Sequence, residues 1–148
     1  MLSLPLLYLS AYFHRYRQEY YDLLLGVSER GAWRDWLLFF LRGVAEQAED
    51  ATVRARKLQD LREEWRGRLA QARTSALALR LVDALFTAPI ITIPQAQRLL
   101  QVAYHSARNN VERLVQMGIL QPLGNVSYGK TYVAAEILNI IHGQDQPA

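Results

Sequence analysis

Cysteine is absent from all 148 residues of the sequence. This absence excludes a catalytic thiol, a disulfide framework and any zinc site built from cysteines. A chain without thiols fits a reducing compartment, so we expect a cytoplasmic protein. Because 51% of the residues are hydrophobic, the chain is not of the disordered class, and its length is enough for one or two small domains with real cores.

Long hydrophobic runs are also missing. The apolar stretches at 2–9, 23–25 and 37–41 are far shorter than the roughly 20 residues that cross a bilayer. The first stretch has no leading Lys or Arg and is broken by Pro5, so it is a poor signal peptide. We interpret it as the start of a packed helix, and we expect no membrane partner.

The common catalytic constellations are lacking too. His14, His105 and His142 lie in three separate segments, without the spacing of metal ligands. There is no Gly-x-Ser-x-Gly motif and no dinucleotide-binding fingerprint. The sequence therefore predicts no catalytic residue, no metal and no cofactor in this chain.

One segment matches a phosphate-binding motif letter for letter, but the elements expected around it differ from those that the motif needs. Gly124–Thr131 fits the P-loop pattern, which needs a strand before the loop and a helix after it. Here Lys130 leads into Tyr132 and Val133, a strand-like pair close to the end of the sequence. We interpret this segment as the loop of a β-hairpin, for which its glycines and Asn125 are suited.

Residues 1–73 form the first predicted domain, a helical segment. One helix is expected from Pro5 to about Leu25, followed by a turn at Gly26–Gly31. A second helix is expected from Ala32 to Ala72, about 60 Å long if continuous, with a bend or break favoured at Gly43. Its apolar positions keep close to a heptad rhythm: Leu37, Phe40, Val44, Ala48, Ala51, Ala55, Leu58, Trp65, Leu69 and Ala72. The pattern fits either a coiled-coil dimer seam or an ordinary helix with a charged, solvated face.

Residues 74–148 form the second predicted domain. A helical pattern runs through Leu77, Leu81 and Phe86 and stops before Pro89. Thr92 and Gln95 form a capping box that starts a short helix to about Leu100. A third helix is expected over Tyr104–Met117, with Gly118 as the left-handed residue that ends it. Strands at 119–123 and 130–133, a last helix through Ile137 and Ile141, and a polar tail at 143–148 complete the pattern. This order predicts a winged helix-turn-helix with a small β-hairpin.

Several aromatic segments carry a resemblance to a known family. They are Leu6–Phe13, Arg17–Leu24 and Trp33–Leu41 in the first half, and Gly129–Leu138 in the second. In order and aromatic spacing, the first three are similar to the segment that follows the active-site helix of Fic-family proteins. The last is similar to the winged helix that many of those proteins carry as a C-terminal tail. The resemblance implies a mainly α fold and covers nearly the whole chain.

The resemblance also implies an enzymatic activity for proteins of this family, but the catalytic motif for it is not in this sequence. Fic enzymes transfer AMP from ATP to a target hydroxyl, and they use a His-Pro-Phe-x-Asp/Glu-Gly-Asn-Gly-Arg loop. That motif is absent, so no catalytic residue is carried over. We expect the non-catalytic C-terminal part of such a protein, arising from excision, an internal start or a truncated gene. Without the catalytic half, its first helices would expose apolar surface, and we therefore expect self-association into a homo-oligomer.

Two functions remain open for the winged helix, beside a purely structural role in which it only completes a core. In the first, it binds double-stranded DNA through the third helix and the wing; the candidate residues are Tyr104, His105, Ser106, Arg108, Asn109, Arg113 and Lys130. After residue 73 there are five basic and four acidic side chains, so binding by a monomer should be weak. Ala103 stands where the family pattern often has serine, and alanine cannot cap a helix. In the second, the domain binds a protein partner or the Fic catalytic segment, without DNA.

Overall fold

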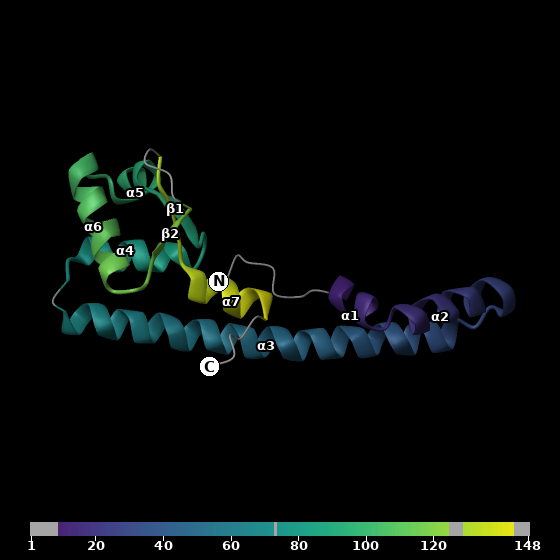
Figure 1. The fold of residues 1–148 in the computed structure, drawn as a ribbon. Coiled ribbons are helices and arrows are strands. Elements are labelled where there is room, and N and C mark those ends of the chain that lie inside the picture. Colours follow the sequence, from purple (N-terminus) through teal and green to yellow (C-terminus); the bar gives the residue numbers. More distant parts are fainter. Residues whose placement is uncertain (1–8, 73, 125–128, 144–148) are drawn as a thin grey trace. The chain divides into compact units, whose positions relative to one another are not determined.

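The computed structural model describes residues 9–72, 74–124 and 129–143. They form seven helices and one three-stranded antiparallel sheet, a mainly helical structure as the sequence predicts (Figure 1). Contacts group the described residues up to Ala55 into one compact unit and those from Arg56 onward into another. The predicted domain boundary instead lies after residue 73. No helix within the described ranges is long and apolar enough to cross a membrane.

The first unit begins with two helices, α1 (Leu9–Arg15) and α2 (Arg17–Arg30). The single helix predicted to Leu25 is therefore wrong, because the helix is interrupted at Tyr16. The turn predicted from Gly26 is also wrong. Helix α2 continues through Gly26, and Gly31 ends it with a left-handed φ of 62° while the amide of Ala32 donates to the carbonyl of Gly26.

Helix α3 (Trp33–Gln71) is continuous, so the predicted long helix is confirmed and the predicted bend or break at Gly43 is wrong. The glycine has a packing reason instead: the ring of Tyr12 lies against it, and a Cβ at position 43 would meet Tyr12 Cδ1 at 2.5 Å. Tyr12 and Phe39 are almost fully buried, with ring centroids 5.1 Å apart. Burial raises the pKa of Tyr12 above its ordinary value. These rings are the core of the first unit.

The second unit contains the rest of α3 and a compact set of short elements. In chain order these are α4 (Ala76–Leu85), β1 (Ile90–Thr92), α5 (Ile93–Leu100), α6 (Tyr104–Gln116), β2 (Gln121–Leu123), β3 (Thr131–Val133) and α7 (Ala135–His142). The sheet order is β1-β3-β2, with Ile91 and Pro122 both opposite Tyr132. The sequence predicted every helix of this set and the hairpin strands, but not β1.

Local chemistry explains where these helices begin and end. The capping box is confirmed: the Thr92 hydroxyl accepts from the Gln95 amide, and Gln95 Oε1 accepts from the Thr92 amide at 2.8 Å. Gly118 has a φ of 74°, and the Ile119 amide donates to the Leu114 carbonyl just after α6. These residues fix the connection from β1 to α5 and from α6 to the sheet.

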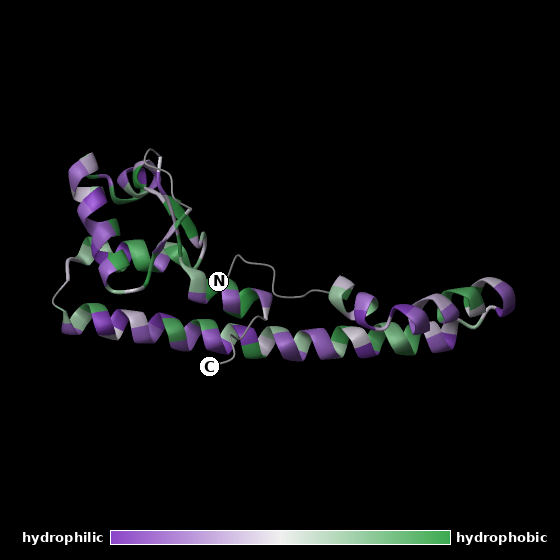
Figure 2. Cartoon of the chain, in the orientation of Figure 1, coloured by the Kyte–Doolittle hydropathy of each residue, from purple (hydrophilic) through white to green (hydrophobic). Residues whose placement is uncertain are grey.

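The core of the second unit is apolar and tightly packed. The hydropathy colouring of α4 is mostly green, whereas α3 is mixed along its length (Figure 2). Ala96 and Ala107 are fully buried where α5 and α6 meet, and their small side chains allow the close approach of these helices. Trp65 of α3 is fully buried, with its ring 5.5 Å from that of Phe86.

Polar contacts fasten α3 to the same core. Asp83 of α4 accepts from Arg62 at 2.9 Å and from Arg66 at 3.3 Å. Arg68 donates to the carbonyl of Met117, just beyond α6. The C-terminal part of α3 is therefore held both on α4 and on the residue that follows α6.

Candidate nucleic-acid interface

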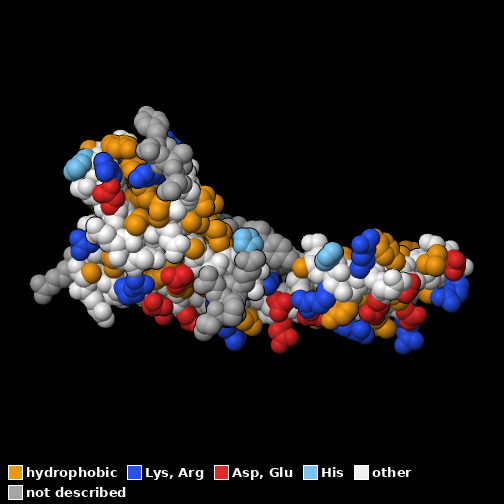
Figure 3. All heavy atoms as spheres, viewed as in Figure 1, with side chains coloured by type: hydrophobic (Ala, Val, Ile, Leu, Met, Phe, Trp, Pro, Cys, Tyr) orange, Lys and Arg blue, Asp and Glu red, His pale blue; other side chains and the backbone are white. Residues whose placement is uncertain are grey.

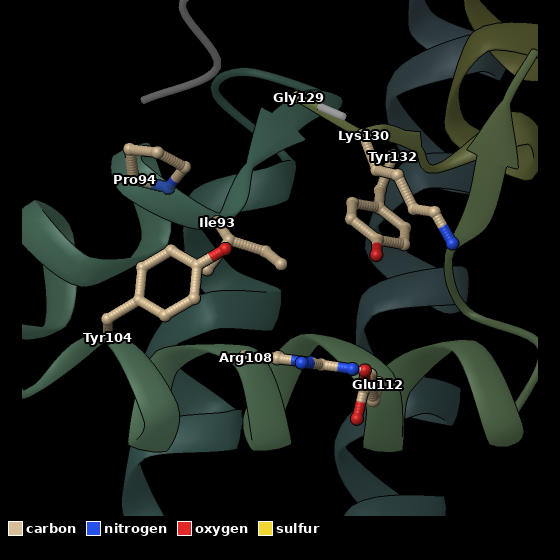
Figure 4. A pocket seen from close by; sticks show the side chains of 8 residues that line it. All are labelled: Ile93, Pro94, Tyr104, Arg108, Glu112, Gly129, Lys130 and Tyr132. Atoms are coloured by element: carbon tan, nitrogen blue, oxygen red, sulfur yellow. The ribbon is translucent and has the colours of Figure 1, made fainter. Parts of the chain in front are cut away.

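An open groove of about 400 Å³ lies between the first turn of α5, one face of α6 and the start of β3 (Figure 4). Its lining consists of Ile93, Pro94, Tyr104, Arg108, Glu112, Gly129, Lys130 and Tyr132. Three of the predicted DNA-binding residues, Tyr104, Arg108 and Lys130, are among them. They come from α6 and from the beginning of β3, so the tertiary fold brings them together.

Helical spacing explains one wall of the groove. Tyr104, Arg108 and Glu112 are four residues apart and therefore share one face of α6. The opposite wall is β3, where Tyr132 is 6% exposed and Lys130 is exposed. The capping box sets the entry into α5 and so positions Pro94 at the edge of the groove.

An ion pair dominates the electrostatics of the groove. Arg108 Nε donates to Glu112 Oε1 at 2.7 Å, and both side chains remain about half exposed. The hydrogen bond to Glu112 raises the pKa of Arg108 above its ordinary value. Arg108 and Lys130 against Glu112 leave one net positive charge among the lining residues. The groove therefore attracts an anion only weakly.

The other four predicted residues do not line this groove. His105 and Asn109 are exposed on the neighbouring face of α6. Ser106 is half-buried, and its carbonyl accepts from Asn110 Nδ2 at 2.8 Å. Arg113 does not line the groove, and its Nη2 instead donates to the carbonyl of Ala72 at 3.2 Å. The predicted set thus divides between the groove, the adjacent exposed face and a contact with the end of α3.

Sequence reasoning did not assign Ile93, Pro94, Glu112 and Tyr132 to the site. Glu112 could have been found from its spacing, since it is four residues after Arg108 on the same helix. Tyr132 and the start of α5 could not, because their nearness to α6 depends on the pairing of β1 with β3. Pro94 indicated from the sequence only that a helix begins there, and not that it belongs to the site.

The P-loop interpretation was rejected from sequence, and the described part of the motif agrees with that rejection. Lys130 is followed by strand β3 and not by the helix that a P-loop requires. Residues 125–128 of the motif lie outside the described residues. As predicted, Ala103 precedes α6 without any side-chain hydrogen bond to the helix.

The described residues contain no cluster of three or more His, Asp or Glu side chains that could hold a metal ion. On the face shown in Figure 3, the described side chains over this part of the second unit mix apolar, basic and acidic types. No protein-family model matches the chain.

Proposed function

We propose that residues 76–143 form a winged helix-turn-helix that binds double-stranded DNA weakly, with α6 as the recognition helix and the β2–β3 hairpin as the wing. The observation that carries this proposal is the groove in which Tyr104 and Arg108 of α6 face Lys130 at the start of β3. The element order and the sheet order β1-β3-β2 support it, because the hairpin directly follows the third helix of the set and its second strand pairs with β1, just before α5.

The two cations would have different roles on a duplex. Arg108 would enter the major groove, where an arginine fork pairs with the O6 and N7 atoms of guanine. Glu112 holds Arg108 through Nε, which leaves the two terminal nitrogens free of that carboxylate. Lys130 would contact a phosphate, which contributes affinity but no sequence preference. His105 and Asn109 lie on the adjacent exposed face and would meet the same major groove.

We also propose, from the resemblance of the aromatic segments, that the chain is the non-catalytic C-terminal part of a Fic-family protein. In such a protein the winged helix would regulate the adenylyl-transferring half or direct it to its target. The aromatic residues that carry the resemblance include Tyr12, Phe39 and Phe40, which pack against Phe13 or one another in the first unit. Their packing role accounts for the spacing without requiring any catalytic residue in this chain.

A second candidate function is a protein-interaction module without DNA binding. One observation favours it: several large apolar side chains of the second unit are exposed, namely Ile90, Leu99, Tyr104 and Leu123, at 47%, 39%, 51% and 51%. Apolar contacts of this kind suit a protein surface better than a phosphate backbone.

Fluorescence anisotropy of a labelled mixed-sequence duplex, titrated at low and at physiological salt, distinguishes these functions. We expect binding that weakens steeply with salt, since each phosphate contact adds about 0.9 to the slope of log K against log salt. The double variant Arg108→Ala/Lys130→Ala should reduce that slope by about 1, because only Lys130 contacts a phosphate in this arrangement, and should weaken binding further through the lost base contact of Arg108. A matched double variant, Arg34→Ala/Arg56→Ala, removes the same charge from exposed positions outside the groove and should bind like the wild type.

Two results would contradict the DNA proposal. One is the absence of binding at low salt, which would favour the protein-interaction function and call for a pull-down with a Fic catalytic segment. The other is an equal loss of binding in both double variants, which would show that only net charge matters.

A further inference from the structure

The α6 side of the groove presents a cation and an anion that are already joined. Arg108 and Glu112 lie one helical turn apart, and Arg108 Nε donates to Glu112 Oε1 at 2.7 Å. Figure 4 shows the two side chains meeting on one side of the groove, across from Tyr132. Because 54% of the Arg108 side chain and 42% of the Glu112 side chain are exposed, the joined pair is accessible to a ligand.

A carboxylate at this place reduces the affinity for phosphates. Affinity for DNA comes largely from phosphate neutralisation, and Glu112 offsets one of the two positive charges that Arg108 and Lys130 bring to the groove. A half-exposed ion pair within one helix contributes little to stability, so helix stability is a weak reason for an acid here. A carboxylate facing DNA has one further use, because it accepts a hydrogen bond from the exocyclic amine of cytosine.

The ion pair leaves a definite set of hydrogen-bonding atoms unused. Within the described residues, the two terminal nitrogens of Arg108 and the second carboxylate oxygen of Glu112, Oε2, have no partner. These atoms are donors at the end of a planar fork and an acceptor beside them. Their order is set by the bond to Nε, which holds the carboxylate on one side of the guanidinium group.

The major-groove edge of a G·C base pair has the complementary order. Guanine offers two acceptors, N7 and O6, and the N4 amine of cytosine follows as a donor. An A·T pair offers the acceptor N7, then the N6 amine, then the acceptor O4. One arginine donor would then face a donor, and the carboxylate would face an acceptor. The joined side chains therefore match a G·C pair and mismatch an A·T pair.

From this complementarity we propose that Arg108 and Glu112 together read one G·C base pair, in which Arg108 pairs with guanine and Glu112 accepts from the N4 amine of cytosine. Glu112 is then a specificity-determining residue, since it orients Arg108, rejects A·T and lowers the affinity for phosphates in general. This inference rests on the proposed DNA binding and extends it by naming the base pair that is read and the role of the acid.

Selection from a library of duplexes with a randomised core, followed by anisotropy on the selected duplex, tests the preference. For the wild type we expect one fixed G·C pair, whose replacement by A·T weakens binding by about 100-fold through the loss of both contacts. Glu112→Ala should lose part of this preference. The matched control Glu63→Ala removes a glutamate from an exposed position of α3 outside the groove, and it should keep the whole preference.

Base analogues in the selected duplex isolate the contact of Glu112. 2-Pyrimidinone in place of the cytosine lacks the N4 amine, so it should weaken binding by the wild type by about tenfold and leave binding by Glu112→Ala unchanged. Inosine in place of the guanine is the control, because it also removes one Watson–Crick hydrogen bond but keeps the atoms of the major-groove edge. It should bind the wild type with unchanged affinity.

Thermal unfolding separates base reading from a structural role. Because the ion pair is half exposed, Glu112→Ala should unfold at nearly the wild-type temperature and bind a mixed-sequence duplex at least as tightly as the wild type. Wild-type binding without a base preference, or a preference that is unchanged in Glu112→Ala, would overturn this inference and leave DNA binding intact. The absence of binding to every duplex at low salt would overturn the proposed function and this inference with it.

Discussion

Two glycines of α3 show how differently the same residue type can be used. Gly43 lies under the ring of Tyr12, and a Cβ there would be 2.5 Å from Tyr12 Cδ1. Gly67 is exposed on the same helix, and nothing lies within 4 Å of a Cβ built on it. Sequence alone assigns both the same helix-weakening cost of about 1 kcal/mol. The structure separates them, because only Gly43 is in contact with a buried ring.

We therefore expect Gly43→Ala and Gly67→Ala to have opposite effects. Gly43→Ala should destabilise the protein by about 1–3 kcal/mol, because the methyl group overpacks against Tyr12 by more than the helix gains. Gly67→Ala should stabilise it by up to about 1 kcal/mol. Urea unfolding followed by circular dichroism measures both. A stabilised Gly43→Ala variant would show that the ring of Tyr12 moves freely.

At the scale of elements, the starts of α5 and α6 differ in the quality of their caps. At the start of α5, the side chain of Thr92 accepts from the amide of Gln95, and the side chain of Gln95 accepts from the amide of Thr92. Ala103 occupies the corresponding position before α6 with extended backbone angles, φ −62° and ψ 152°, and offers no side-chain acceptor. The helix that carries Tyr104 and Arg108 therefore begins without a side-chain acceptor for its first amides.

Substitutions at the two N-cap positions should change the free energy of unfolding in opposite directions. Thr92→Ala should cost about 1 kcal/mol, because it removes the acceptor for the Gln95 amide. Ala103→Ser should gain up to about 1 kcal/mol, since the backbone at 103 already suits a capping serine. Thermal unfolding by calorimetry gives both shifts. If Ala103→Ser brings no gain, the first turn of α6 is already satisfied by another donor–acceptor pair or by water.

The same scale shows which elements the sequence could predict. The helices at 93–100 and 104–116 were predicted closely because their caps, proline and glycine are local signals. The single helix to Leu25 was wrong because the helix is interrupted at Tyr16, and the turn at Gly26 was wrong because this glycine is buried inside α2. Strand β1 was missed because Ile90–Thr92 becomes a strand only by pairing with residues 131–133, about forty positions later.

At the scale of the whole chain, contacts divide the described residues into two compact units although α3 runs through both. Trp65 is the largest fully buried side chain, and it belongs to the second unit together with Phe86. Its indole nitrogen has no hydrogen-bond partner in the structure, so its contribution comes from packing.

Replacing this tryptophan should affect the two units unequally. Trp65→Ala should destabilise the second unit by about 3–5 kcal/mol through lost burial and a residual cavity. Hydrogen exchange followed by mass spectrometry should show faster exchange in α4 and α6 and a much smaller change in α1 and α2. An equal loss of protection throughout would show that the two units unfold as one.

The sequence by itself determined the local features of this protein: the long helix, the capped helices, the β-hairpin after α6 and the absence of the Fic catalytic motif. These depend on residues within a few positions of one another, where propensity, capping and periodicity act. The tertiary structure decided the rest. It placed Lys130 and Tyr132 across from Arg108, turned Arg113 toward Ala72 and left the leucines of α3 exposed. Such placements depend on pairing and packing between residues distant in sequence, which no local pattern specifies.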